Sequence, residues 1–204
     1  MFMRKYLTLL SMLCLVLPGF SQQGRNWDKP MELQRCSINV KADFFTATTF
    51  IEMEFFNPNN QEIEGLYRFQ LLPGQAITAL QLDLFGKLRD GSIEEKWKAA
   101  NAYNTIVGKR VDPALLQMDG YNSYSLRIYP VPAKSTRRIT MTIQQALEVQ
   151  GDAVNYTLPI TNKDKIKKFQ IEIDVNHSAS KAFVKEGLLK GKMFHQLPGI
   201  QQID

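Results

Sequence analysis

The sequence predicts a mainly β protein, an antiparallel β-sandwich with one amphipathic α-helix packed on it. Most of the chain consists of short segments in which apolar and polar residues alternate, the pattern of strands that bury one face. Glycine, proline, asparagine and aspartate punctuate these segments as turns. Only one stretch has helical spacing. Seven or eight short strands with a single helix favour a sandwich over alternating β-α units.

The strands can be placed in order from the alternation. The first predicted strand has Cys36, Ile38 and Val40 on one face. The second ends in an asparagine-rich turn at residues 57–60, and its apolar face carries Ala47, Thr49, Ile51, Met53 and Phe55. The same alternation predicts strands near residues 67–71, 80–84, 124–128 and 139–143. Two more are expected at residues 154–158 and 169–175.

The helix is predicted over residues 93–107. Ser92 and Glu95 have the spacing of a capping box, in which each side chain satisfies a backbone donor of the first turn. Gly108 can take the left-handed conformation at the C-terminal end, and Pro113 prevents much continuation. One face of this helix carries Ile93, Trp97, Ala100 and Val107.

Residues 1–21 are predicted to be a signal peptide. Arg4 and Lys5 precede an apolar run over residues 6–20, and Gly19 and Ser21 supply the small residues of a cleavage site. The run is shorter than the ~20 residues that span a bilayer as a helix. We therefore expect a secreted, periplasmic or cell-surface protein. Retention of the segment as a membrane anchor is the alternative.

The mature chain would keep one cysteine, Cys36, so the fold must be stabilised by its core without an internal disulfide. A buried thiol beside Ile38 and Val40 is the expected state. The net charge of +5 falls to about +3 without the signal peptide. The C-terminal region holds two groups of lysines, Lys163, Lys165, Lys167 and Lys168, then Lys181, Lys185, Lys190 and Lys192. They suit a polyanion or, equally, a solvated strand edge.

No catalytic, metal-binding or cofactor-binding residues are predicted. The two histidines, His177 and His195, lack a serine or cysteine elbow and metal-ligand spacing. Asp43, Asp112 and Asp119 are isolated acids, and no phosphate-binding or calcium-binding loop occurs. If an active site existed, Cys36 and His177 would be its nucleophile and base. Nucleic acid is not expected as a partner, because a secreted chain leaves the compartment that contains nucleic acid and because no recognition helix is apparent.

A few residues are candidates for an interaction surface. Phe44, Phe50 and Phe56 fall on the outward face of the second predicted strand, which suggests that the helix, through Trp97, or another domain covers this face. Arg127 and Arg138 are expected on outward faces of neighbouring strands. There they could pair with Glu52 or Glu54, or bind a partner.

From about residue 35 to residue 147, the order of five segments resembles the VIT domain, the vault protein and inter-alpha-trypsin module. The segments contain Phe55-Phe56-Asn57, then Tyr67 to Pro73, then the helix with Glu95, Lys96, Ala99, Ala102 and Tyr103, then Asp112 to Leu116, then Arg127 to Pro132. The chain departs from the usual pattern at Gln117 and at Ala133-Lys134. The motif residues expected to be structural are Trp97, Tyr103, Asp112, Pro113, Leu115, Leu116, Arg127, Pro130 and Pro132.

The resemblance implies an organisation and a function. It implies a VIT domain over residues 28–148, followed by a C-terminal β extension or the start of a further region at 149–204. In relatives this module commonly precedes a von Willebrand type A domain with an Asp-x-Ser-x-Ser metal site, a motif that this sequence lacks. The expected function is a non-catalytic interaction or scaffolding module, without cofactor, that contacts a protein partner or an adjacent domain. Membrane contact is expected only through an uncleaved N-terminal segment.

Two alternatives stay open at this point. The chain could bind a polyanion or glycan through its lysine-rich C-terminal region. It could also be the front part of a larger adhesion protein that combines a VIT domain with a von Willebrand A domain.

Overall fold

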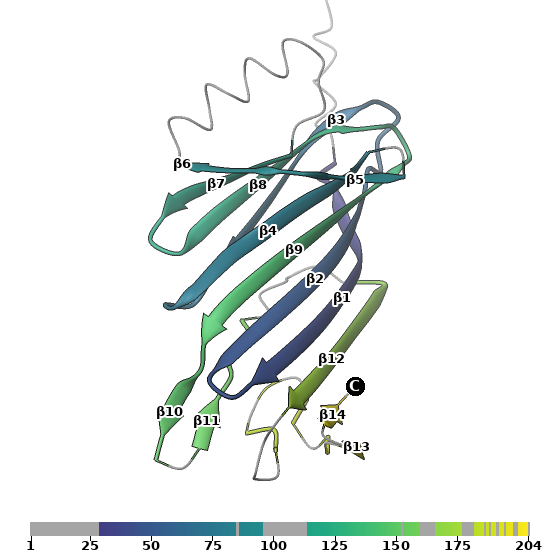
Figure 1. The fold of residues 1–204 in the computed structure, drawn as a ribbon. Helices are drawn as coiled ribbons and strands as arrows, with labels where there is room; N and C mark the ends of the chain where they lie inside the picture. The colour runs from purple at the N-terminus through teal and green to yellow at the C-terminus, as the bar shows by residue number, and fades with distance from the viewer. Residues whose placement is uncertain are drawn as a thin grey trace, which may run out of the picture.

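The computed structural model describes residues 29–84, 86–95, 114–151, 153–159, 166–176, 182–185, 187, 189–190, 192–193, 195–197 and 200–203. Within these ranges the protein is mainly β, as predicted, and contains no helix (Figure 1). The strands are β1 (Glu32–Asp43), β2 (Thr46–Phe56), β3 (Ile63–Gln70), β4 (Gln75–Leu84), β5 (Lys87–Asp90), β6 (Ser92–Glu95), β7 (Ala114–Gly120), β8 (Ser123–Val131), β9 (Thr136–Ala146), β10 (Glu148–Gln150), β11 (Ala153–Asn155), β12 (Lys168–Asn176), β13 (His195–Leu197) and β14 (Ile200–Ile203).

Two sheets and one short hairpin make up the described fold. The large sheet has eight strands in the order β13-β14-β12-β1-β2-β9-β4-β5, and the small sheet has four in the order β3-β8-β7-β6. Strands β10 and β11 pair only with each other. Figure 1 shows the small sheet near one end of the long strands, and the β1–β2 turn and the β10–β11 hairpin at the other end.

The core lies between the two sheets, where their inward faces meet. Val40, Ile51 and Ile139 are buried on the large sheet, and Leu126 and Ile128 are buried on the small one. Each such side chain contributes about 1.5–3 kcal/mol when it is fully removed from water. The rings of Phe55 in β2 and Tyr67 in β3 lie 5.2 Å apart and join the sheets directly.

The predicted alternation of the first two strands is confirmed. Cys36, Ile38 and Val40 are buried in β1, and Ala47, Thr49, Ile51, Met53 and Phe55 are buried in β2. The register places Ile38 opposite Ile51, so the apolar faces coincide. The predicted strands near 139–143 and 169–175 are also present, as β9 and β12.

The predicted start of the helix is wrong. Ser92, Ile93 and Glu95 lie in β6, which pairs in parallel with β7 from Ser92 opposite Leu115 to Glu95 opposite Met118. The capping pattern is a local preference, and the backbone hydrogen bonds offered by β7 override it. Residues 96–107, with Trp97 and Tyr103, lie outside the described residues, so the packing of a helix on this fold stays a prediction.

The sheets are not purely antiparallel. Besides the parallel β6–β7 pair, β12 pairs in parallel with β1 over nine positions, from Arg35 opposite Lys168 to Asp43 opposite Asn176. Strands β5, β7, β10, β13 and β14 had no predicted counterpart. The C-terminal strands β12, β13 and β14 therefore continue the same sheet as β1. In the part of the chain described, no helix is both long and apolar enough to cross a membrane.

Candidate functional site

Four exposed apolar side chains lie on two hairpins, β1–β2 and β10–β11, at the end of the large sheet that lies away from the small sheet. We call Phe44, Phe45, Val149 and Val154 the apolar end. Phe44 and Phe45 form the two-residue turn between β1 and β2 and are 64% and 62% exposed. The Leu147 amide donates to the Phe45 carbonyl at 2.7 Å, so β10 begins beside this turn. Val149 and Val154 are direct partners across the β10–β11 hairpin.

The position of Phe44 differs from the prediction, which placed it on the second strand. Its backbone is in the left-handed region, with φ of 48°. Two-residue hairpin turns favour asparagine and glycine at such positions, because larger side chains are strained there. The predicted second strand was extended back to Phe44, because a Phe-Phe pair gives no local signal for a turn.

Phe50 and Phe56 do not join Phe44 in one surface. Phe50 is 42% exposed on the outer face of β2, between Asn39 of β1 and Thr142 of β9. Phe56 is half-buried at the far end of β2, and the Lys167 Nζ lies 5.9 Å from its ring centroid. The six residues from Phe50 to Phe56 correspond to about 20 Å of strand. The predicted aromatic face is therefore three separate positions.

A shallow polar hollow lies next to the apolar end. It is lined by the start of β2, the end of β9 and the β3–β4 turn, with Thr46, Thr48, Gln144 and Gly74 among its residues. Its volume is about 350 Å³. A partner that covers Phe44 and Phe45 would also meet the hydrogen-bonding side chains that line this hollow.

The two arginines lie in different sheets, so the expectation of neighbouring strands is wrong. Arg127 is in β8 of the small sheet, where its Nη1 lies 3.4 Å from Glu64 Oε1. Arg138 is in β9 of the large sheet, where its Nη2 donates to Asp83 Oδ2 at 2.8 Å and its Nη1 lies 4.0 Å from Glu52. Both arginines are more than a third exposed, so these ion pairs contribute little to stability.

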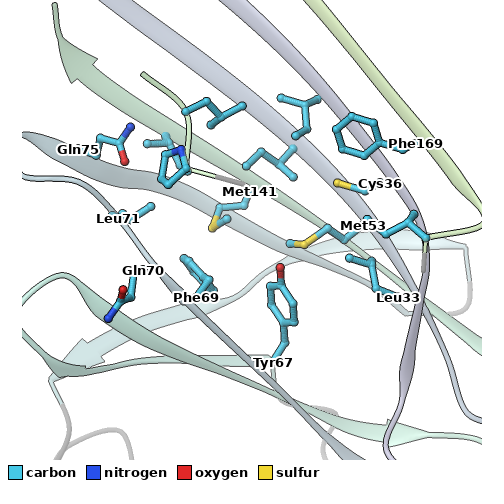
Figure 2. A pocket seen from close by; sticks show the side chains of 16 residues that line it. Leu33, Cys36, Met53, Tyr67, Phe69, Gln70, Leu71, Gln75, Met141 and Phe169 are labelled. Carbon is cyan, nitrogen blue, oxygen red and sulfur yellow. The ribbon is translucent and has the colours of Figure 1, made fainter. Parts of the chain in front are cut away.

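An apolar cavity of about 70 Å³ lies between the sheets beside the edge strand β3. Its walls come from the inner faces of β1, β2 and β9, from Tyr67 and Phe69 of β3, and from residues 158, 159 and 166. Figure 2 shows Met53, Met141 and Tyr67 pointing toward this common space. Cys36 also lines it, and burial raises the pKa of its thiol to about 11. At neutral pH this thiol is protonated, so it is a poor nucleophile.

The structure does not test whether Cys36 and His177, the pair that an active site would need, lie close together. Cys36 is buried, and His177 lies outside the described residues. Asp119 is not isolated, because it accepts hydrogen bonds from the Ser125 hydroxyl and, at 2.8 Å, from the Gln117 amide. Within the ranges that the structure describes, no three histidine, cysteine, aspartate or glutamate side chains are placed to hold a metal ion.

A family model described as the Vault protein inter-alpha-trypsin domain matches residues 33–143 of this chain. The chain belongs to the VIT domain family. The match begins in β1 and ends in β9, so it includes the small sheet and strands β1, β2, β4, β5 and β9 of the large sheet. Strands β10 to β14 lie beyond it.

A more distant similarity links this VIT domain to a larger protein. Over 130 residues it is 25% identical to a von Willebrand factor A domain-containing protein of Dictyostelium discoideum. This region covers 63% of the present chain and 14% of that protein, so the chain spans a small part of the relative's length.

Among solved structures, the fold is similar to part of the M1 zinc metallopeptidase from Deinococcus radiodurans. The TM-score is 0.46 at 10% identity, over 85% of this chain and 38% of the peptidase. A variant of the same peptidase gives a TM-score of 0.42 at the same identity and coverage.

Among the VIT motif residues that the structure describes, two leucines are buried and two prolines accept hydrogen bonds through their carbonyls. Leu115 and Leu116 in β7 are 3% and 0% exposed. The Pro130 carbonyl accepts a hydrogen bond from Arg137 Nε at 2.8 Å, and the Tyr129–Pro130 peptide bond is cis. Pro132 follows β8, and its carbonyl accepts from Asn57 Nδ2 at 3.1 Å. Trp97, Tyr103, Asp112 and Pro113 lie outside the described residues.

Asn57 is the residue whose role the sequence reasoning missed. It was interpreted as an ordinary turn residue, yet it is fully buried. Its Nδ2 donates to the carbonyls of Gln61 at 2.8 Å, Val131 at 2.9 Å and Pro132 at 3.1 Å. Its Oδ1 accepts from the backbone and side chain of Asn59. Asn57, in the first VIT segment, thus connects the end of β2 to Val131 and Pro132 in the last VIT segment, at the end of β8.

Proposed function

We propose that this VIT domain is a non-catalytic interaction module of the cell exterior or envelope, and that it contacts a protein partner through the apolar end. The observation that supports this is the exposure of Phe44 and Phe45, at 64% and 62%, in the two-residue turn between β1 and β2. Exposed aromatic pairs beside polar groups are typical of interaction surfaces.

The apolar end can supply substantial binding energy. A phenylalanine buries roughly 200 Å² when it is fully covered, so covering the exposed part of each ring is worth about 3 kcal/mol at ~25 cal/mol per Å². Val149 and Val154, at 55% and 42% exposed, extend the surface that a partner could cover. This is enough for the two phenylalanines to act as the centre of a moderate-affinity interface.

The backbone of Phe44 allows binding to be separated from folding. Because its φ is 48°, asparagine should fit this position with less strain than phenylalanine. We expect Phe44→Asn to keep or raise the thermal stability of the chain and to weaken partner binding. A residue kept for the fold would behave in the opposite way.

Site-specific photo-crosslinking in intact cells tests the proposal. A photoreactive amino acid at Phe45 should give one discrete protein adduct, identified by mass spectrometry, and Phe44→Asn should reduce its yield. The matched control is Tyr121, which is 84% exposed in the β7–β8 turn. Equal crosslinks at both positions, or no crosslink at Phe45 either to another protein or to a further domain of the same polypeptide, would contradict the proposal. N-terminal sequencing of the same protein tests cleavage of residues 1–21.

A von Willebrand A domain is the partner class that we favour. The similarity to a von Willebrand factor A domain-containing protein supports it, although the matched region is 14% of that relative. Such a domain could be joined to the same polypeptide or belong to another protein. Identification of the Phe45 adduct decides between this class and others.

A polyanion or glycan is the second candidate partner, supported by a group of cations on the outer face of the large sheet. Lys168 lies directly opposite Arg35 in the β1–β12 pair, and Lys167 precedes it. Glu54 of β2 faces Arg35 from the other side and reduces the local charge. Retention on a heparin column that falls at least tenfold with Lys167→Ala and Lys168→Ala would favour this candidate. Retention unaffected by these changes would argue against it.

A further inference from the structure

The polar hollow next to the apolar end is formed by two paired strands and one turn. Thr48 of β2 lies directly opposite Gln144 of β9, and Thr46 lies opposite Ala146. Gly74 of the β3–β4 turn lines the hollow from another side. The β2–β9 pairing runs over the whole length of β2 without a register shift, so regular backbone hydrogen bonds hold these side chains in place.

The hydroxyl and amide groups of this hollow reach the solvent. Gln144 is exposed and Thr48 is half-exposed. A hydroxyl and a primary amide can each both donate and accept hydrogen bonds. The hydroxyls of a sugar have the same double capacity, whereas a carboxylate only accepts and an ammonium group only donates. The side chains of the hollow therefore match a ligand that carries several hydroxyls.

An aromatic ring continues the same face of the sheet. Phe50 follows Thr48 by two positions, so both side chains point to the same side of β2, about 7 Å apart along the strand. Phe50 is 42% exposed, and its partner across β9 is Thr142. A pyranose ring carries hydroxyls at its rim and C–H groups on its face, and the C–H face packs on aromatic rings. Phe50 and the hollow thus offer the two kinds of contact that a sugar needs.

Two charged residues of β1 border this face, and their charges have opposite signs. Lys41 lies opposite Thr48, and Asp43 lies opposite Thr46 in the β1–β2 pair. An anion beside the hollow would be attracted by Lys41 and repelled by Asp43, and a cation would meet the reverse. A neutral hydroxyl can bond to either group. The charges around the hollow therefore favour a neutral ligand.

We propose that this hollow binds one neutral pyranose unit of a glycan, with the apolar face of the sugar on Phe50 and its hydroxyls bonded to Thr48 and Gln144. The volume of about 350 Å³ is at the lower end of the roughly 300–1,000 Å³ of small-molecule sites, which suits a single sugar unit. Because the hollow is shallow, we expect a dissociation constant on the order of 1–10 mM. The site lies at the opposite end of β2 from Lys167 and Lys168, so it is distinct from the site proposed for a polyanion.

NMR on the full chain tests this site, with the methyl glycosides of glucose, galactose, mannose and N-acetylglucosamine as probes. We expect at least one of them to shift the side-chain amide signals of Gln144 and the ring signals of Phe50 in a saturable way. The side-chain amide of Gln170, which is exposed in β12, should not move. Sorbitol has the hydroxyls of a hexose without the ring, so it should bind at least tenfold more weakly.

Surface substitutions provide matched controls. Gln144→Ala and Phe50→Leu should each weaken binding of the best probe at least tenfold, whereas Phe50→Tyr keeps the ring and should change it less than threefold. Gln170→Ala and Phe44→Asn should leave binding unchanged, and loss of binding in Phe44→Asn would assign the sugar to the apolar end and overturn the proposal. Absence of a shift with all four glycosides, equal binding of sorbitol, or unchanged binding by Gln144→Ala would also overturn it. If Gln144→Ala does not fold, the signals of the unaltered chain and the comparison with sorbitol decide.

Discussion

Replacement of Asn57 by alanine should destabilise this protein more than any other single change to a polar residue discussed above. Asn57 is fully buried, and its side chain bonds three backbone carbonyls and two groups of Asn59. These contacts hold the end of β2 against the end of β8 and so fix how the two sheets meet. Alanine keeps the backbone but removes every one of them.

The magnitude follows from the environment of each bond. The amide has two hydrogens for the carbonyls of Gln61, Val131 and Pro132, and each net hydrogen bond is worth about 1 kcal/mol. The Val131 bond is buried, so its carbonyl loses a partner that water cannot easily replace, which adds about 1 kcal/mol. The bonds to Asn59 are partly exposed and add less. We expect Asn57→Ala to lower the free energy of unfolding by about 3 kcal/mol, a large part of the 5–15 kcal/mol typical of a domain.

Urea unfolding followed by tryptophan fluorescence and circular dichroism measures this change. With a slope of roughly 2 kcal/mol per M, the midpoint should fall by about 1.5 M. Asn39→Ala is the control, because Asn39 is half-exposed on the outer face of β1 and should change stability by less than about 0.5 kcal/mol. Asn57→Asp should be at least as damaging as Asn57→Ala at pH 7, because the introduced carboxylate faces carbonyl oxygens. An Asn57→Ala midpoint within about 0.3 M of the unaltered chain would refute the reasoning.

The remaining predictions concern an ionisable core residue, an ion pair and a close contact. Burial raises the pKa of Cys36 from 9.0 to about 11, so the folded state keeps this proton longer than the unfolded state. The free energy of unfolding should therefore fall by about 2–3 kcal/mol as the pH rises through this interval, and Cys36→Ala should flatten that loss in alkaline urea titrations. A double-mutant cycle on Arg138 and Asp83 should give a coupling below about 1 kcal/mol that weakens in about 0.5 M salt, and a coupling above about 2 kcal/mol would contradict this. Gly65→Ala would place a Cβ against the thioether of Met31 and should cost about 1 kcal/mol, less in a Met31→Ala background.

Alternation was a reliable guide to the strands that bury one face. It identified the inward residues of β1 and β2, because a side-chain period of two leaves one consistent apolar face. The sequence pattern was misleading for β6, because Ser92 and Glu95 have the spacing of a helix cap. In the structure these residues pair with β7 instead. Alternation also missed β5, whose four residues are all exposed, so no apolar face marks it.

The candidate site was harder to predict than the fold. The sequence drew attention to Phe44 but placed it on a strand, because a turn without glycine, asparagine or proline gives no local signal. The alternation correctly placed Arg138 on an outward face, yet its partner Asp83 comes from β4, 55 positions away. The cavity could not be predicted at all, because it depends on how far β3 extends across the large sheet.

The sequence by itself determined the family, the mainly β class and the buried faces of the long central strands, since these depend on residue order and on a periodicity that one strand carries alone. Tertiary structure decided the parallel pairing of β12 with β1, the burial of Asn57 and the position of the Phe44-Phe45 turn beside the start of the β10–β11 hairpin. Each of these depends on contacts between segments distant in the chain. Such contacts form because one segment satisfies another's hydrogen bonds or covers its apolar surface, and no local pattern records which partner it will be.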